Sequence, residues 1–138
     1  MAERASRTLF LNLPVRDLAA SRRFFERLGF RFHARYTDEL AACMIVSDSA
    51  YVMLLTEPFF ATFAPKPRCD TRTQAEGCFT LSCRSRAEVQ RLLAEALGAG
   101  AMPAGAPLDH GFMCASSFLD LDGHHWQVRW EDPHAVLA

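Results

Sequence analysis

The chain has 138 residues, of which 50% are hydrophobic and 22% are charged, and its formal net charge is −1. This length is typical of one domain, which can bury enough apolar surface to fold without disulfides or a structural metal. A nearly neutral chain without a basic stripe argues against nucleic acid and against an anionic membrane as partners. Because we find no secretory segment and no apolar run of about 18 residues, we expect a cytoplasmic protein.

The first half opens with an apolar run at residues 9–13 that Pro14 ends, as in a short strand. Asp17 is placed to cap a helix after it, and Gly29 ends that helix, where a left-handed residue is favoured. Three strand-like runs follow, at residues 30–36, 41–47 and 51–56.

The second half repeats this order. Residues 78–83 form a strand-like run, and Ser85 and Glu88 have the spacing of a capping box for a helix that Gly98 ends. An edge strand is expected to start at residues 101–102, and two longer strands at 112–119 and 125–130. Two equal units of this kind indicate a pseudo-two-fold arrangement around a shared cleft.

Residues 57–77 join the halves and are rich in proline and charge, but they also carry Phe59, Phe60 and Phe63. A linker with three phenylalanines is not purely solvated. Two interpretations remain open: the segment packs as a short helix over the mouth of the cavity, or it forms part of a dimer contact.

Three segments together resemble the vicinal oxygen chelate superfamily, which includes glyoxalases of the lactoylglutathione lyase type, extradiol dioxygenases and bleomycin-resistance proteins. They are the strand-into-helix opening at residues 11–25, Leu28-Gly29-Phe30, and residues 118–124, which read Phe-Leu-Asp-Leu-Asp-Gly-His. In the last segment Leu121 replaces the proline that is usual in the superfamily.

The resemblance implies an α+β fold of two βαβββ modules that form a cupped mixed sheet with helices on its outer face. One domain would span residues 1–138, with module 1 at about 7–56, the linker at about 57–77 and module 2 at about 78–131. Because such proteins usually form dimers, we also expect a homodimer.

Catalytic members of the superfamily hold a divalent metal, and the resemblance places their four ligand positions at Phe10, Leu54, Cys78 and Gln127. The dioxygenase type uses three of these positions, Phe10, Cys78 and Gln127. Phenylalanine and leucine cannot ligate a cation, a lone cysteine is a soft ligand, and a glutamine carbonyl is a weak one. We therefore predict no metal and no other cofactor.

Alternate residues of a strand point to opposite faces, so the cavity lining can be predicted from Phe10 and Leu54. The residues that alternate with this lining point to the other face of each sheet. They are almost wholly apolar, as needed beneath two helices. The residues expected to bind a small-molecule ligand are Phe10, Asn12, Leu54, Cys78, Thr80, Phe112, Gln127 and Arg129.

His125 falls on the same inward face and is the candidate catalytic residue, as a general base or hydrogen-bond donor. The alternative is a histidine bonded to a neighbouring strand or filling space. Arg129 could clamp an anionic ligand group or form a rim salt bridge with Glu131 or Asp132. His124, at the turn, is expected to be exposed.

The favoured hypothesis is a glyoxalase-related protein that binds a small, partly aromatic molecule in its cup without the divalent metal. Two alternatives stay open. One is a metal-dependent lyase, isomerase or dioxygenase with a displaced site near His125. The other is a drug-sequestering resistance protein, for which we find no acidic cleft in this nearly neutral chain. Whether the protein is an enzyme does not follow from the sequence.

Overall fold

The computed structural model describes residues 6–135, and the chain divides into two compact units, Met1–Arg68 and Cys69–Ala138. Each unit holds one mixed sheet with one long helix, so the expected α+β class and the two βαβββ-type modules are confirmed. The expected cup depends on how the two units are arranged relative to each other, so it remains a prediction. No helix within residues 6–135 is long and apolar enough to cross a membrane.

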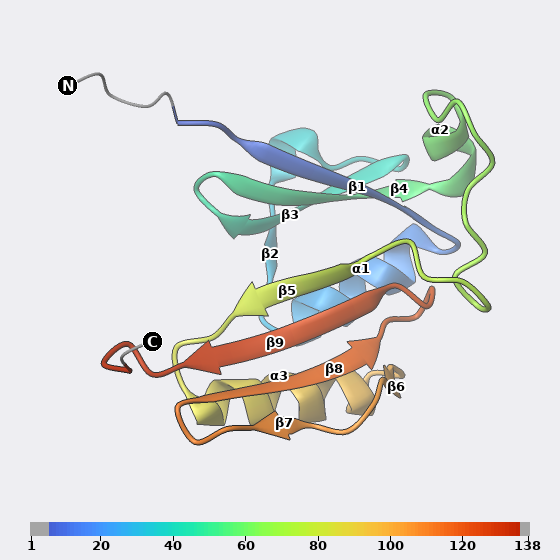
Figure 1. Cartoon of the computed structure of the whole chain (residues 1–138). Coiled ribbons are helices and arrows are strands. Elements are labelled where there is room, and N and C mark those ends of the chain that lie inside the picture. Colours follow the sequence, from blue (N-terminus) through green and yellow to red (C-terminus); the bar gives the residue numbers. More distant parts are fainter. Residues whose placement is uncertain (1–5, 136–138) are drawn as a thin grey trace. The chain divides into compact units, whose positions relative to one another are not determined.

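Unit 1 contains a four-stranded sheet in the order β1-β4-β3-β2 (Figure 1). Strand β1 runs parallel to β4, and the other neighbours are antiparallel. Its elements are β1 (Leu9–Val15), α1 (Leu18–Arg27), β2 (Arg31–Phe32), η1 (Ala34–Tyr36), β3 (Ala41–Ser47), β4 (Ala50–Thr56) and α2 (Glu57–Ala61). The segment expected as one strand at 30–36 is thus a two-residue strand followed by a 3₁₀ turn.

Helix α1 begins as predicted, because the Asp17 side chain accepts a hydrogen bond from the Ala20 amide at 3.0 Å. It ends at Arg27, and Gly29 follows with φ 104°, a left-handed conformation that glycine adopts without steric cost. Phe24 and Phe25 bury its apolar side, and the helix packs against β2, β3 and β4. This contact covers one face of the sheet, and we call the opposite face the open face of unit 1.

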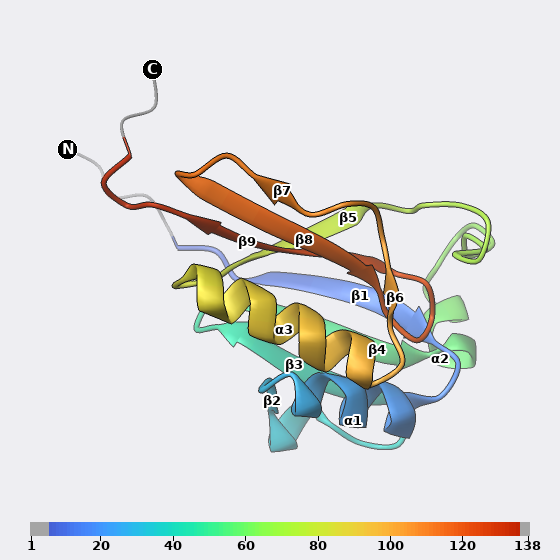
Figure 2. The ribbon, with the colours of Figure 1, turned by 90° about the horizontal axis from the view of Figure 1, so that it is seen from below.

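Unit 2 contains a sheet in the order β5-β9-β8-β6, with β7 also paired to β8. Helix α3 (Arg86–Gly98) is capped by Ser85, which accepts from the Glu88 amide at 3.1 Å, and it packs against β8 and β9 (Figure 2). The strands are β5 (Cys78–Ser82), β6 (Met102–Pro103), β7 (Leu108–Asp109), β8 (Met113–Leu119) and β9 (His125–Glu131). The expected single edge strand is therefore split into β6 and β7, which pair with opposite ends of β8.

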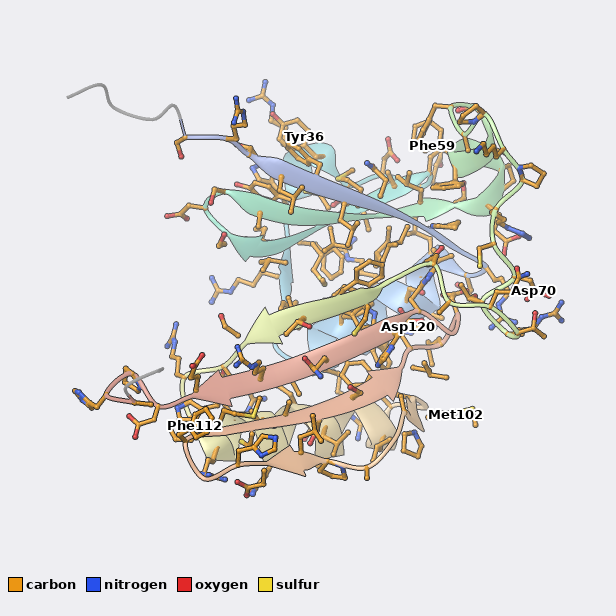
Figure 3. All side chains as sticks on the ribbon, viewed as in Figure 1. Tyr36, Phe59, Asp70, Met102, Phe112 and Asp120 are labelled. Atoms are coloured by element: carbon orange, nitrogen blue, oxygen red, sulfur yellow. The ribbon has the colours of Figure 1, made fainter. Side chains whose placement is uncertain are left out.

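The turn between β8 and β9 is organised by one buried carboxylate, that of Asp120 (Figure 3). It accepts hydrogen bonds from the amides of Asp122 at 2.9 Å and His124 at 3.0 Å, and from the Trp126 indole at 2.9 Å. Burial raises the pKa of Asp120, and these donors together with His124 oppose that shift. The carboxylate thus connects the turn to the fully buried Trp126, the largest side chain of the core.

Replacement of Asp120 by alanine should lower the free energy of unfolding by about 3 kcal/mol, because three buried donors lose their acceptor. Urea denaturation followed by circular dichroism measures this change. The matched control is Asp48→Ala in the exposed turn between β3 and β4, where we expect a change within about 0.5 kcal/mol. Equal effects of the two substitutions would contradict the role assigned to Asp120.

Candidate functional site

The open face of the unit 1 sheet carries a pocket of about 590 Å³, which we call the aromatic pocket. It combines four ring side chains with two sulfur-containing and two polar ones. Its lining residues are Thr8, Phe10, Asn12, His33, Tyr36, Cys43, Tyr51 and Met53. A cavity of this size with few polar groups is typical of a small-molecule site.

Strand register explains this lining. Phe10 lies opposite Tyr51 in the parallel pair of β1 and β4, and their rings stack at 5.2 Å with an interplanar angle of 18°. One pleat further along, Asn12 lies opposite Met53, which in turn lies opposite Cys43 of β3. Since paired residues point to the same face, the floor of the pocket is built from rows of residues across three strands.

A wall of the pocket comes from the segment after β2. The His33 amide donates to the Cys43 carbonyl at 2.8 Å, and the Cys43 amide donates to Thr37 Oγ1 at 3.1 Å. These bonds hold the segment on β3, where the rings of His33 and Tyr36 lie 4.8 Å apart. Tyr36 is 55% exposed.

The expected orientation of Leu54 is wrong. Leu54 lies opposite Leu13 and Ala42, on the face covered by helix α1, and it is fully buried. A side chain in the core cannot contact a ligand on the open face, so Leu54 is replaced in the lining by its neighbour Met53. Of the residues predicted in unit 1, Phe10 and Asn12 do line the pocket.

In unit 2 the predicted residues share one face of the sheet, because Cys78, Thr80 and Ser82 lie opposite His125, Gln127 and Arg129. Thr80 Oγ1 donates to Gln127 Oε1 at 3.2 Å. Arg129 lies 3.4 Å from the Glu131 carboxylate, which corresponds to the salt-bridge alternative. The face of unit 2 is therefore polar where that of unit 1 is aromatic.

Phe112 is not brought close to His125. Phe112 directly precedes β8. The next residue, Met113, pairs with Glu131, the last residue of β9, whereas His125 is the first residue of β9. Six residues of strand separate the two ends, about 20 Å, and Figure 3 shows Phe112 and Asp120 at opposite ends of β8. Phe112 is 44% exposed and its ring stacks on His110 at 6.3 Å.

His125 borders a pocket of about 200 Å³ between residues 71–77 and the β8–β9 turn. Its Nε2 is buried and has no hydrogen-bond partner. The neighbouring His124 was expected to be exposed but is 2% exposed, because its Nδ1 contacts the Glu76 carboxylate. The end of the linker also bonds to this turn, since Thr71 Oγ1 donates to the Asp122 carbonyl.

The loop at residues 109–111 is held in place by Arg86, the first residue of α3. Its guanidinium binds both carboxylate oxygens of Asp109, at 2.8 and 3.1 Å, donates to the Gly111 carbonyl and stacks over the Trp130 ring at 5.1 Å. The Arg86 hydrogen bond lowers the pKa of Asp109.

The residues at the superfamily's metal positions do not fit a divalent cation. Phe10 offers no donor atom, and the Leu54 side chain offers none either and points into the core. The remaining two, Cys78 and Gln127, differ in softness, and the Gln127 carbonyl already accepts from Thr80. Within residues 6–135, no three His, Cys, Asp or Glu side chains are grouped so that they could hold a metal ion.

Residues 7–47 match the family model described as bleomycin resistance protein-like N-terminal. No curated protein matches the sequence. Among solved structures, a glyoxalase-related enzyme from Fulvimarina pelagi superposes with a TM-score of 0.78 at 15% identity, over 97% of this chain and 94% of that one.

Two further structures match over most of both chains. A glyoxalase/bleomycin resistance protein/dioxygenase family enzyme from Burkholderia phytofirmans PsJN has a TM-score of 0.72 at 15% identity, covering 88% of this chain and 96% of that one. Lactoylglutathione lyase from Agrobacterium tumefaciens has a TM-score of 0.66 at 15% identity, covering 97% and 100%.

These matches define the class of protein: the chain has the glyoxalase/bleomycin resistance protein/dioxygenase fold. The resemblance of its sequence to the vicinal oxygen chelate superfamily is thereby confirmed at the level of the fold.

The thiols of unit 2 should differ strongly in reactivity. Burial and the nearby Glu88 carboxylate raise the pKa of Cys83 to about 11, which leaves about 0.1% thiolate at pH 8. Cys78 is exposed on β5. We expect iodoacetamide at pH 8 to modify Cys78 well before Cys83, as measured by peptide mass mapping. The control is the denatured chain, in which both should react alike; equal rates in the folded protein would contradict this prediction.

Proposed function

We propose that this protein binds a small, partly aromatic molecule in the aromatic pocket of unit 1. The observation that carries the proposal is the pocket itself, about 590 Å³ on the open sheet face with the rings of Phe10, Tyr51 and Tyr36 on it. Phe10 and Tyr36 are each about half exposed, an unfavourable state for large apolar rings that a ligand would relieve. Asn12 supplies a polar side chain that can orient the ligand.

The ligand would be held without the divalent metal of the superfamily's enzymes. The support is the donor chemistry at Phe10, Leu54, Cys78 and Gln127, which suits no hard or borderline cation. Stacking and hydrogen bonding then supply the binding free energy. Drug sequestration is a special case of this proposal, and an antibiotic that binds in the pocket would identify it.

Replacement of Phe10 by alanine should weaken binding of an aromatic ligand about tenfold, because a stacking surface is lost. A thermal-shift screen of aromatic acids, thiol conjugates and antibiotics identifies a ligand, and calorimetric titration measures its affinity. Phe112→Ala is the matched control, since Phe112 is 44% exposed, compared with 51% for Phe10, but lies outside the pocket. Equal losses in the two variants would refute the site, and no hit in the screen would refute the proposal.

A second candidate is an enzyme that uses His125, of the lyase, isomerase or dioxygenase type. The observation that favours it is the buried Nε2 of His125 without a partner at the edge of a pocket. A group in this position can transfer a proton to a bound molecule. Such an enzyme could hold a metal away from the superfamily's positions.

Metal analysis of protein purified without chelator separates the two candidates. The first predicts no stoichiometric nickel, zinc, iron or manganese, both in the parent protein and in the His125→Ala variant. Stoichiometric metal that is lost in His125→Ala but kept in His110→Ala, on the loop before β8, would favour the metalloenzyme. Elemental analysis by mass spectrometry gives this answer directly.

We also propose a homodimer in the cytoplasm. The support is the exposed apolar surface of the linker, where the Phe63 ring contacts Phe59 and Phe60 at 5.7 and 5.8 Å and yet remains 52% exposed. Sedimentation at micromolar concentration should give the mass of two chains, and a monomer would refute the proposal.

A further inference from the structure

The wall of the aromatic pocket contains a polar atom without a partner. His33 is half-buried, and its Nδ1 is buried and forms no hydrogen bond. Burying a hydrogen-bonding atom without a partner destabilises a folded protein, so such atoms are rare and each needs an explanation. The backbone of His33 is fully engaged, with its amide bonded to the Cys43 carbonyl and its carbonyl accepting from the Tyr36 amide at 3.1 Å. Only the imidazole is left to find a partner.

The lining of the aromatic pocket carries no formal charge. None of the residues that line the aromatic pocket is Asp, Glu, Lys or Arg. Burial raises the pKa of the Cys43 thiol on its floor, so this group is also neutral at physiological pH. Arg35 lies over the Tyr36 ring at 5.7 Å but is not part of the lining. A charged ligand group would lose hydration there without gaining a counter-ion.

The floor favours a flat ring. Cys43 and Met53 are opposite each other on β3 and β4, and both of these sulfur-containing residues line the pocket. Sulfur contacts with aromatic rings are favourable, and the rings of Phe10, Tyr51 and Tyr36 supply further stacking surfaces. The lining therefore selects a planar aromatic molecule by its faces, and His33 Nδ1 offers a polar contact in addition to the side chains of Thr8 and Asn12.

We infer that the ligand is an uncharged aromatic compound that bears a hydroxyl group, and that His33 is the residue that selects this group. The inference rests on the proposed function, because it assumes that the aromatic pocket is the binding site. A hydroxyl both donates and accepts, so it can pair with His33 Nδ1 in either neutral tautomer. The ring of His33 can turn about its Cβ–Cγ bond to present the nitrogen to the ligand, which needs only side-chain motion.

The test uses three probes of similar size: phenol, toluene and benzoate. NMR titration of the parent protein should show phenol binding about fivefold more tightly than toluene, since one neutral hydrogen bond is added. Benzoate should bind more weakly than phenol, because its charge finds no partner. In His33→Phe the preference for phenol over toluene should disappear while toluene still binds.

Two further variants complete the test. His33→Gln keeps a neutral hydrogen-bonding side chain and should retain part of the preference for phenol, whereas the control His110→Phe should leave it unchanged. A preference that is absent in the parent protein or persists in His33→Phe overturns the inference but not the proposed function. Tighter binding of benzoate than of phenol overturns it as well. If none of the probes binds to the parent protein, the inference is overturned, whereas the proposed function fails only if the thermal-shift screen also yields no ligand.

Discussion

The candidate site depends on the register of the parallel pair formed by β1 and β4. In this register Phe10 lies opposite Tyr51 and Asn12 opposite Met53, while Leu13 lies opposite Leu54. Because side chains alternate along a strand, a slip of β4 by one residue would turn Tyr51 and Met53 toward the core and Leu54 toward the pocket. Helix α1 prevents that slip, since Phe24 and Phe25 are buried only when the apolar face of the sheet is turned toward the helix. Packing on the covered face thus defines the chemistry of the open face.

The same register explains which parts of the site could be predicted. In β9 polar and apolar residues alternate strictly from His125 to Trp130, so the sequence indicates both faces, and the pairing with β5 confirms them. In β4 the run from Tyr51 to Leu55 is apolar throughout, and periodicity cannot say which face is buried. The inward placement of Leu54 followed from the superfamily resemblance, and the periodicity of β4 could not correct it. His33 and Tyr36 could not be found either, because Tyr36 lies in a 3₁₀ turn, His33 directly precedes it, and tertiary bonds hold this segment against β3.

Long-range contacts account for the other differences between sequence and structure. A histidine in a turn is normally exposed, but His124 is buried by its contact with Glu76, which lies 48 residues earlier in the chain. The same part of the linker places the Thr71 carbonyl so close to Gly123 that a Cβ there would lie 2.7 Å from it, and Gly123 also has φ 86°. The helix caps at Asp17 and Ser85, in contrast, are local interactions and were predicted correctly. Prediction succeeded where the decisive partner was a near neighbour in sequence.

The two units show how far a shared architecture constrains function. Both sheets bury the side that faces a helix, with Leu54 in unit 1 and Trp126 in unit 2 among their fully buried residues. The open faces are under no such constraint, because a residue there contributes little to the core. Unit 1 consequently carries Phe10 and Tyr51 where unit 2 carries polar residues such as Thr80 and Gln127. The shared architecture therefore constrains the covered face of each sheet, whereas the residues on the open face differ between the units and are aromatic in unit 1 and polar in unit 2.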